Sequence, residues 1–222
     1  TNTMKIVIQC AAKKDPNAGH LVNGEGKPVL FVANPENAPP SDICLYAHPD
    51  DLAERGKTWR ELLIDYNNHP ENTPLNLRPA YTLYSNSTYA LLVDRFGADN
   101  VFILSAGWGL ISAAFLTPKY DITFAQTSRD QKYKQRSNRD QYHDLCMLPT
   151  EADDDLVFFG GKGYLPLFCT LTRSYQGHRF VFYNSNVEPD TPGCTLIRYP
   201  TTTRTNWHYG CAKDFMAGTI GI

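Results

Sequence analysis

The stretch from residue 103 to residue 124, ILSAGWGLISAAFLTPKYDITF, holds the densest group of residues that could bind or act on a ligand. An apolar run delivers Ser105, and the glycines after it would let a ligand approach the backbone closely. Trp108 offers a flat surface on which a nucleobase could stack. The alternative is a tight turn that buries a core tryptophan. On the first interpretation, the pocket is lined by Ser105, Trp108, Gly109, Tyr120 and Asp121.

A second group of polar residues follows the first apolar run, KIVIQC at residues 5–10. In open α/β sheets, ligands bind outside the carboxyl ends of the strands. Residues 9–15 are therefore a candidate rim of the site, with Gln9 and Cys10 facing a base and Lys13 facing phosphate.

The sequence FGGKGY at residues 159–164 is a glycine-rich turn between a predicted strand and a predicted helix. Its amides, together with Lys162 and Tyr164, could hold a phosphate. The spacing is neither that of a Walker loop nor that of a dinucleotide fingerprint, so it does not indicate ATP or NAD. A turn whose glycines serve packing explains the pattern equally well.

The C-terminal run YPTTTRTNWHYGCAK, residues 199–213, offers the best nucleic-acid surface in the chain. Arg204, Asn206 and Lys213 could contact phosphates, while neighbouring aromatic rings stack on bases and His208 serves as an acid or base. The alternative is a helix cap leading into a last helix that packs Trp207 on the core.

Charge is distributed unevenly along the chain. The formal net charge is −2, which argues against a protein that coats nucleic acid by bulk electrostatics. Residues 119–140, however, hold six basic and three acidic side chains, and residues 156–222 hold the same numbers. These two stretches would supply the contacts to a DNA backbone, although a run such as 128–139 is more often a solvated surface.

No metal or cofactor signature is present in the sequence. The six cysteines form no C-x-x-C pair and no Cys/His cluster at zinc spacing, so we expect them to be reduced. The three aspartates at 153–155 resemble a solvated acidic turn. We therefore expect chemistry that uses neither a metal nor a cofactor.

The elements that must position these residues alternate along the chain. Apolar runs at 5–10, 100–105, 155–160 and 179–183 read as buried strands, and patterns at 50–66, 79–96 and 164–174 read as helices. Parallel strands need crossover helices and are buried on both faces. The sequence predicts a three-layer α/β/α fold with a mostly parallel central sheet of about four or more strands.

Length and composition set the outer limits. With 222 residues, 42% hydrophobic and 20% charged, the chain is an ordinary globular protein, and we expect a single α/β domain over residues 1–222. No apolar run approaches the roughly 20 residues that span a bilayer, and no secretory signal is evident. We expect a cytoplasmic protein without a membrane partner.

The run S-A-x-W-G-L at 105–110, followed by P-K-Y-D-I at 118–122, resembles the S-x-x-Y-G-L and P-Y-x-L pattern of YaaA-like peroxide-stress proteins and of related domains found near DNA-modification and phage-defence genes. Trp108 replaces the usual tyrosine, and Lys119 interrupts the Pro-Tyr pair. The match covers about a tenth of the chain. It implies a nucleic-acid-associated α/β protein that uses the pocket residues given above.

A fainter similarity is to the layout of the uracil-DNA glycosylase superfamily, in which polar residues follow the first, second and fourth strands. Here these places hold residues 9–15, Ser105 and the segment at 183–186 that contains Asn184. The superfamily's catalytic motifs are absent, so no catalytic residue is transferred. The layout implies a base-sized pocket and cleavage of an N-glycosidic bond on a flipped nucleotide.

Such cleavage passes through a cation-like sugar, which needs a nearby carboxylate to stabilise charge or position water. Asp121 is the first candidate and Asp15 the second, although either could be a surface residue. The leading hypothesis is a DNA glycosylase that excises a modified base in a setting such as anti-phage defence. The alternatives are a nucleotide-processing enzyme that acts on free nucleotides, and a DNA-binding module without catalysis.

Overall fold

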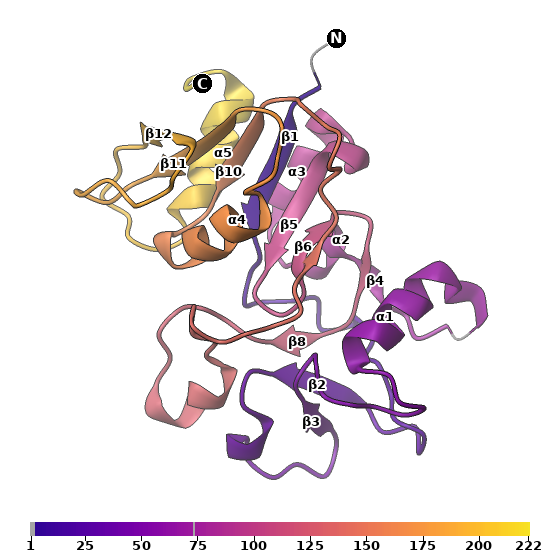
Figure 1. Cartoon of the computed structure of the whole chain (residues 1–222). Coiled ribbons are helices and arrows are strands. Elements are labelled where there is room, and N and C mark those ends of the chain that lie inside the picture. Colours follow the sequence, from indigo (N-terminus) through magenta and orange to yellow (C-terminus); the bar gives the residue numbers. More distant parts are fainter. Residues whose placement is uncertain (1–2, 73) are drawn as a thin grey trace.

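The apolar runs form the middle of a seven-stranded sheet. The computed structural model describes residues 3–72 and 74–222, and its main sheet has the order β12-β11-β10-β1-β5-β6-β9 (Figure 1). The first five strands of that order are mutually parallel, with Ile6 opposite Val157 on one side and Val101 on the other. The predicted α/β fold with a mostly parallel sheet is therefore confirmed. The strands of this sheet are β1 (Lys5–Gln9), β5 (Val101–Ser105), β6 (Gly109–Ser112), β9 (Leu145–Cys146), β10 (Leu156–Phe159), β11 (Arg179–Tyr183) and β12 (Cys194–Arg198).

Helices cover both faces of the sheet because successive strand residues point to opposite sides. On β10, Phe158 stacks on Phe168 of one helix at 4.5 Å between ring centroids. Its neighbour Phe159 faces the other way and meets Phe215 at 5.5 Å. The helices are α1 (Trp59–Asn68), α2 (Ala80–Leu83), α3 (Ser87–Phe96), α4 (Leu165–Leu171) and α5 (Trp207–Ala217).

Two helices differ from the prediction in their boundaries. The sequence predicts a helix that begins at Asp50, but α1 begins after Thr58, whose side chain accepts from Glu61 N while the Glu61 side chain accepts from Thr58 N. This capping box satisfies two backbone donors at once, which a start at Asp50 would not. The predicted helix over 79–96 is two helices, because Tyr84 is extended and the Asn86 side chain starts α3 by accepting from Thr88 N.

Strands β5 and β6 form a hairpin that the sequence analysis does not predict. They pair antiparallel, with Ser105 opposite Gly109 across the turn. Gly109 has φ +100°, and a Cβ there would collide with the backbone of Leu145 in β9. Only glycine fits this position, so the glycine that reads as a ligand contact in the sequence is explained by chain packing.

A smaller sheet and a short strand pair lie apart from the main sheet. β2 (Val29–Val32) is the middle strand of the small sheet, between β3 (Leu45–Ala47) and β8 (Tyr120–Asp121). β4 (Arg78–Pro79) pairs with β7 (Leu116–Thr117). In Figure 1 the small sheet lies beneath the carboxyl ends of β1 and β5, and α1 packs Trp59 against Phe31 of β2 at 5.9 Å. The five 3₁₀ turns described are Pro35–Asn37, Pro70–Asn72, Ala98–Asn100, Arg129–Lys134 and Lys162–Tyr164.

None of the helices within residues 3–72 and 74–222 has the length and apolar character needed to cross a bilayer.

Candidate functional site

The carboxyl ends of β1, β5 and β10 bring several predicted site residues together. β1 ends at Gln9 and leads into Cys10, β5 ends at Ser105, and the turn after β10 carries Tyr164. Tyr120 reaches the same place from β8 of the small sheet, where it donates or accepts within a chain of hydroxyls. The place where strands end is thus polar, although the strands themselves are apolar.

A buried chain of hydroxyl groups forms the centre of this site. Ser105 Oγ donates to Tyr120 Oη at 2.7 Å, and Tyr120 Oη lies 2.6 Å from Tyr84 Oη. Ser105 Oγ also accepts from the backbone N–H groups of Gly107 and Trp108, which fixes the turn after β5. Burial raises the pKa of Tyr84 and Tyr120, so both stay protonated at neutral pH.

A second polar group lies on the other side of Cys10. Cys10 Sγ is 3.5 Å from Tyr164 Oη, and the thiol is buried. Tyr89 Oη donates to the carbonyl oxygen of Gln9 at 2.6 Å and lies 2.9 Å from Tyr209 Oη. The end of β1 is therefore held from both sides by tyrosine hydroxyls.

Lys14 is the amine of the site. It is half-buried, and its Nζ lies 4.3 Å from the centroid of the Tyr120 ring and donates to Ala12 O at 3.1 Å. Burial lowers the pKa of Lys14, and Lys134 acts in the same direction. The negative charge of Asp121 opposes that change without cancelling it. The amine is thus easier to deprotonate than an ordinary lysine.

A pocket of about 220 Å³ opens beside this centre, and its wall runs from the end of β1 to the start of α5. Tyr164 and Phe124 meet edge to face at 5.0 Å in one part of the wall. Gln9 Oε1 accepts from Gly161 N at 2.8 Å, so its Nε2 donors are the part that a ligand could engage. The residues that line the pocket are Gln9, Phe124, Ala125, Gly161, Gly163, Tyr164, Arg204, Thr205, Asn206, Trp207 and His208.

The start of α5 gives the pocket an unusual polar edge. Asn206, the residue before the helix, has φ +58°, a left-handed conformation that costs a side chain about 1–2 kcal/mol and that asparagine tolerates better than most residues. His208 is 3% exposed, and its Nε2 has no hydrogen-bond partner among the described residues. Burial lowers the pKa of His208 to about 4, so the ring is neutral at pH 7.

The two candidate carboxylates lie outside the pocket wall. Asp121, on β8, forms an ion pair with Lys134 at 3.2 Å and is close enough to Lys14 for its charge to act on the amine. Asp15 lies 3.5 Å from Arg78, and its Oδ1 accepts from Asn17 N. The described residues that line the pocket include no carboxylate.

Trp108 does not offer a stacking surface. The side chain is fully buried, with its ring 5.0 Å from Phe31 and 6.2 Å from Tyr120. The interpretation of Trp108 as a base platform is corrected: the residue is a core tryptophan between the main sheet and the small sheet. Ser105 and Gly109 are also buried, so their roles are structural: Ser105 holds Tyr120 through its hydrogen bond, and Gly109 lets the hairpin turn beside Leu145.

The remaining predicted contacts are distributed around the same edge and beyond it. Lys13 and Lys162 are exposed on the loops after β1 and β10. Asn184 follows β11 and donates to Thr203 O at 3.1 Å, which ties it to the loop of Arg204. Lys213 is exposed on α5 beside Leu91 and Asp94 of α3, outside the pocket wall.

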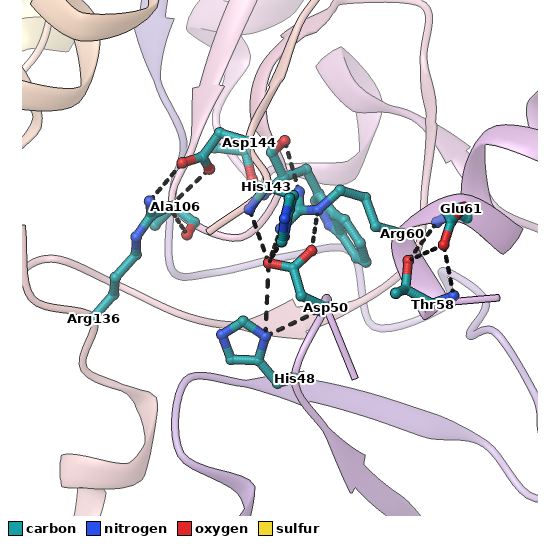
Figure 2. Close-up of polar contacts among 11 residues, drawn as sticks. His48, Asp50, Thr58, Arg60, Glu61, Ala106, Arg136, His143 and Asp144 are labelled. Carbon is teal, nitrogen blue, oxygen red and sulfur yellow. Dashed lines mark hydrogen bonds and ion pairs between the residues drawn. The ribbon is translucent and has the colours of Figure 1, made fainter. Parts of the chain in front are cut away.

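Two buried arginines hold the turn after β5, and no spacing in the sequence identifies them. Arg60 donates to Trp108 O at 3.0 Å while it forms a two-bond pair with Asp50. Arg136 donates to Ala106 O at 2.9 Å while it pairs with Asp144 at 2.6 Å. Figure 2 shows each arginine beside its carboxylate.

Asp50 stays ionised for a physical reason. Burial alone would favour the neutral form of Asp50, but the hydrogen bonds from Arg60 and from the His143 N–H outweigh it and lower the pKa of Asp50. The pairs are structural because each arginine donates both to its carboxylate and to a backbone carbonyl of the turn after β5.

A larger pocket of about 500 Å³ lies between α1 and the loops at residues 21–22 and 54–55, and none of the predicted site residues lines it. Its carboxylates already have partners: Asp65 pairs with Lys57, and Glu54 accepts from Gly24 N. The smaller pocket at the strand ends has the less satisfied polar groups, so we place the candidate site there.

Within the described part of the chain, no group of three or more His, Cys, Asp or Glu side chains is arranged to hold a metal ion. The chain matches no family model, no curated protein and no solved structure.

Proposed function

We propose that the chain is a DNA glycosylase that releases a modified base by hydrolysing its N-glycosidic bond. The observation that carries the proposal is the pocket at the ends of β1 and β10, whose wall includes Gln9 and the Tyr164 ring that contacts Cys10. Three further features support it: the size of the pocket, the groups in its wall, and the charge at its edge.

The size of the pocket suits one planar ring. At about 220 Å³ it is smaller than the ~300–1,000 Å³ typical of sites for drug-sized ligands. A base inside a duplex cannot reach such a pocket, so the target nucleotide would leave its stack and enter alone. The aromatic side chains of Phe124 and Tyr164 supply an apolar wall for the ring.

The polar groups of the wall suit the edge of a base and a water molecule. Gln9 offers Nε2 donors and Asn206 offers a carboxamide, and neither group needs to change its charge. Arg204 is exposed at the edge of the pocket, where its guanidinium can bind the phosphate next to a flipped nucleotide.

The reaction consumes one water molecule. The bond between the base and C1′ breaks, and the base leaves with the electron pair and takes up a proton. Water adds its oxygen to C1′ and gives up a proton. Asp121 would stabilise the cation-like sugar, a role for which its ion pair with Lys134 leaves one carboxylate face accessible at 35% exposure of the side chain.

The rival function in nucleotide processing has less support. A phosphate cradle at residues 159–164 needs free amides, and the Gly161 N–H already donates to Gln9. A base pocket makes use of the same contact, because it holds the Gln9 side chain in one orientation.

The test uses DNA from bacteriophages with modified bases and matched unmodified DNA. After incubation with the protein, mild alkali should break strands at the resulting abasic sites, and mass spectrometry should detect the free base. Turnover of free nucleotides without action on DNA would indicate nucleotide processing. Salt-dependent DNA binding without base release from any substrate would indicate a binding module, and either result would overturn the proposal.

Asn206→Gly is the sharpest variant for this test. Glycine adopts φ +58° freely, so the backbone before α5 is kept while the carboxamide is lost. We expect base release to fall roughly 10–100-fold with unchanged thermal stability. The matched control is Asn76→Gly, which removes another left-handed asparagine (φ +59°) outside the pocket wall and should leave base release unchanged.

A further inference from the structure

Lys14 is held in place more firmly than a surface lysine. Its backbone forms a bridge with Tyr84, and on either side Asp15 N donates to Leu83 O and Ser85 N donates to Lys13 O. Its Nζ lies over the Tyr120 ring at 4.3 Å and 6.0 Å from the Tyr84 ring. The amine thus lies beside two buried aromatic rings, while the hydrogen bond from Nζ to Ala12 O is exposed to solvent.

The charges around Lys14 leave the amine without a dedicated counter-ion. Asp121 faces it from β8, but this carboxylate pairs with Lys134. Lys14 forms no ion pair with any residue in the described part of the chain. Since burial also lowers its pKa, a larger fraction of the amine is neutral at neutral pH than in an exposed lysine.

We infer that Lys14 is an amine nucleophile and that the chain cleaves DNA strands at abasic positions as well as releasing bases. The inference rests on the proposed function, since it takes the pocket beside Cys10 to hold the base. Cys10 connects the two: its thiol contacts Tyr164 of the pocket wall, and it also lies close enough to Lys14 for the two side chains to interact. A lysine that is desolvated in this way is a suitable nucleophile for Schiff-base chemistry.

The bond changes balance without an oxidant or reductant. The Lys14 nitrogen forms a bond to C1′, the N-glycosidic bond breaks, and the base leaves with its electron pair and takes a proton from the amine. The C1′–O4′ bond then breaks and O4′ takes a proton from water, which leaves a protonated imine between C1′ and Lys14. The hydroxide that remains takes a C2′ proton, which expels the 3′ phosphate and breaks the strand, and water then hydrolyses the imine.

The test starts from an oligonucleotide with one preformed abasic site, so it does not depend on base excision. There the amine condenses with the open aldehyde and loses water, giving the same imine. Sodium cyanoborohydride should reduce that imine to a stable amine, which links protein and DNA covalently. Peptide mapping by mass spectrometry should place the link on Lys14.

Paired variants separate Lys14 from its neighbours. Lys14→Met keeps the packing on Tyr120 and should reduce the covalent product roughly 100-fold or more. Lys13→Met removes the adjacent, exposed lysine and should leave the yield of covalent product unchanged. If Lys14→Met fails to fold, the map of the linked peptide in the unaltered protein still decides the question.

The pH dependence of linking gives a readout that a structural role for Lys14 would not affect. The rate should rise with pH through the pKa of Lys14, which lies below the usual 10.5. The groups that face the amine are Cys10, Tyr84, Tyr120, Asp121 and Lys134. Lys134→Gln removes a positive neighbour and frees Asp121, and both changes move this rise to higher pH.

The two proposals fail separately. Base release with no covalent product, or with a product mapped to another amine, overturns the role of Lys14 and leaves the glycosylase standing. A Lys14 product on the abasic oligonucleotide without base release from modified DNA supports the nucleophile and counts against the glycosylase.

Discussion

At the scale of single residues, the site depends on polar groups that the fold keeps away from water. His208 is the clearest example. It lines the pocket but is almost fully buried, and its Nε2 has no hydrogen-bond partner among the described residues. A buried neutral imidazole has a lower proton affinity than the same ring in the unfolded chain. Folding and protonation therefore compete at this position.

We expect this competition to appear as a loss of stability in acid. The pKa of His208 is about 4 when folded and about 6.5 when unfolded, so the unfolded chain binds more protons between these values. Its contribution to the free energy of unfolding is fully present above pH 6.5 and declines as the pH falls to 4, by on the order of 2–3 kcal/mol. Urea unfolding at several pH values across this range should show that His208→Gln reduces the slope of the free energy of unfolding against pH.

The control for this measurement is His178→Gln, which removes an exposed imidazole. It should leave the pH dependence of unfolding as it is in the unaltered protein. Equal slopes for His208→Gln and the unaltered protein would mean that the ring is not buried as described.

At the scale of elements, the turn between β5 and β6 shows why a glycine-rich run is ambiguous in a sequence. The run at 105–110 predicts either a ligand loop or a tight turn. In the structure it is the turn of a hairpin, and its Ser105 hydroxyl donates a hydrogen bond to Tyr120. The choice between these two interpretations depends on Leu145, which comes almost forty residues later in the chain and whose backbone packs against Gly109. No local pattern contains that contact.

Gly109→Ala should therefore destabilise the protein more than its backbone angle alone would require. A left-handed alanine costs about 1–2 kcal/mol, and the collision with Leu145 adds to that. Gly218→Ala is the matched control, because Gly218 has φ +78° with open space around it. Thermal and urea unfolding should show that Gly109→Ala is clearly less stable than Gly218→Ala. Equal losses of stability in the two variants would show that Leu145 does not restrict the turn.

The central strands could be predicted well from the sequence and the site in part, because both follow from the properties of a buried parallel sheet. Strands buried on both faces must be apolar throughout, so β1, β5, β10 and β11 are evident in the sequence. Because parallel strands end at one edge, Gln9, Cys10 and Ser105 could be grouped before the structure was known. Lys14 was one residue from a predicted contact, and the double lysine after β1 was the signal that could have identified it.

Other parts of the site lack any local signal. Tyr84, Tyr89 and Tyr209 come from helices or their ends, where an aromatic residue usually indicates packing. The pairs Asp50–Arg60 and Arg136–Asp144 have spacings that no helix or strand period explains. The first joins a loop to the start of α1, and the second joins two loops.

At the scale of the whole molecule, those two pairs connect the small sheet and its loops to the main sheet. Arg136 is 4% exposed, and it binds Asp144, the carbonyl of Ala106 and the face of Tyr142, 3.7 Å from the ring centroid. Removing one partner of such a pair leaves a buried charge without compensation. The connection is therefore sensitive to single substitutions.

We expect Arg136→Met to lower the free energy of unfolding by roughly 3–5 kcal/mol, because Asp144 is left buried and unpaired. Adding Asp144→Leu should recover much of that loss. Lys57→Met is the control, since it breaks an exposed ion pair with Asp65 and should cause no measurable change. A small effect of Arg136→Met in urea unfolding would show that the pair does not hold the two sheets together.

The central place of β1 also bears on the order in which the molecule assembles. Its two neighbours are β5, roughly a hundred residues later, and β10, some fifty residues beyond that. During synthesis β1 must therefore wait, without its partners in the main sheet, until β5 and then β10 have been made. Long-range closure of this kind slows folding and leaves an apolar segment exposed in the meantime. The end of β1 at Gln9 thus acquires its surroundings only after β5 and the turn that follows β10 have been made.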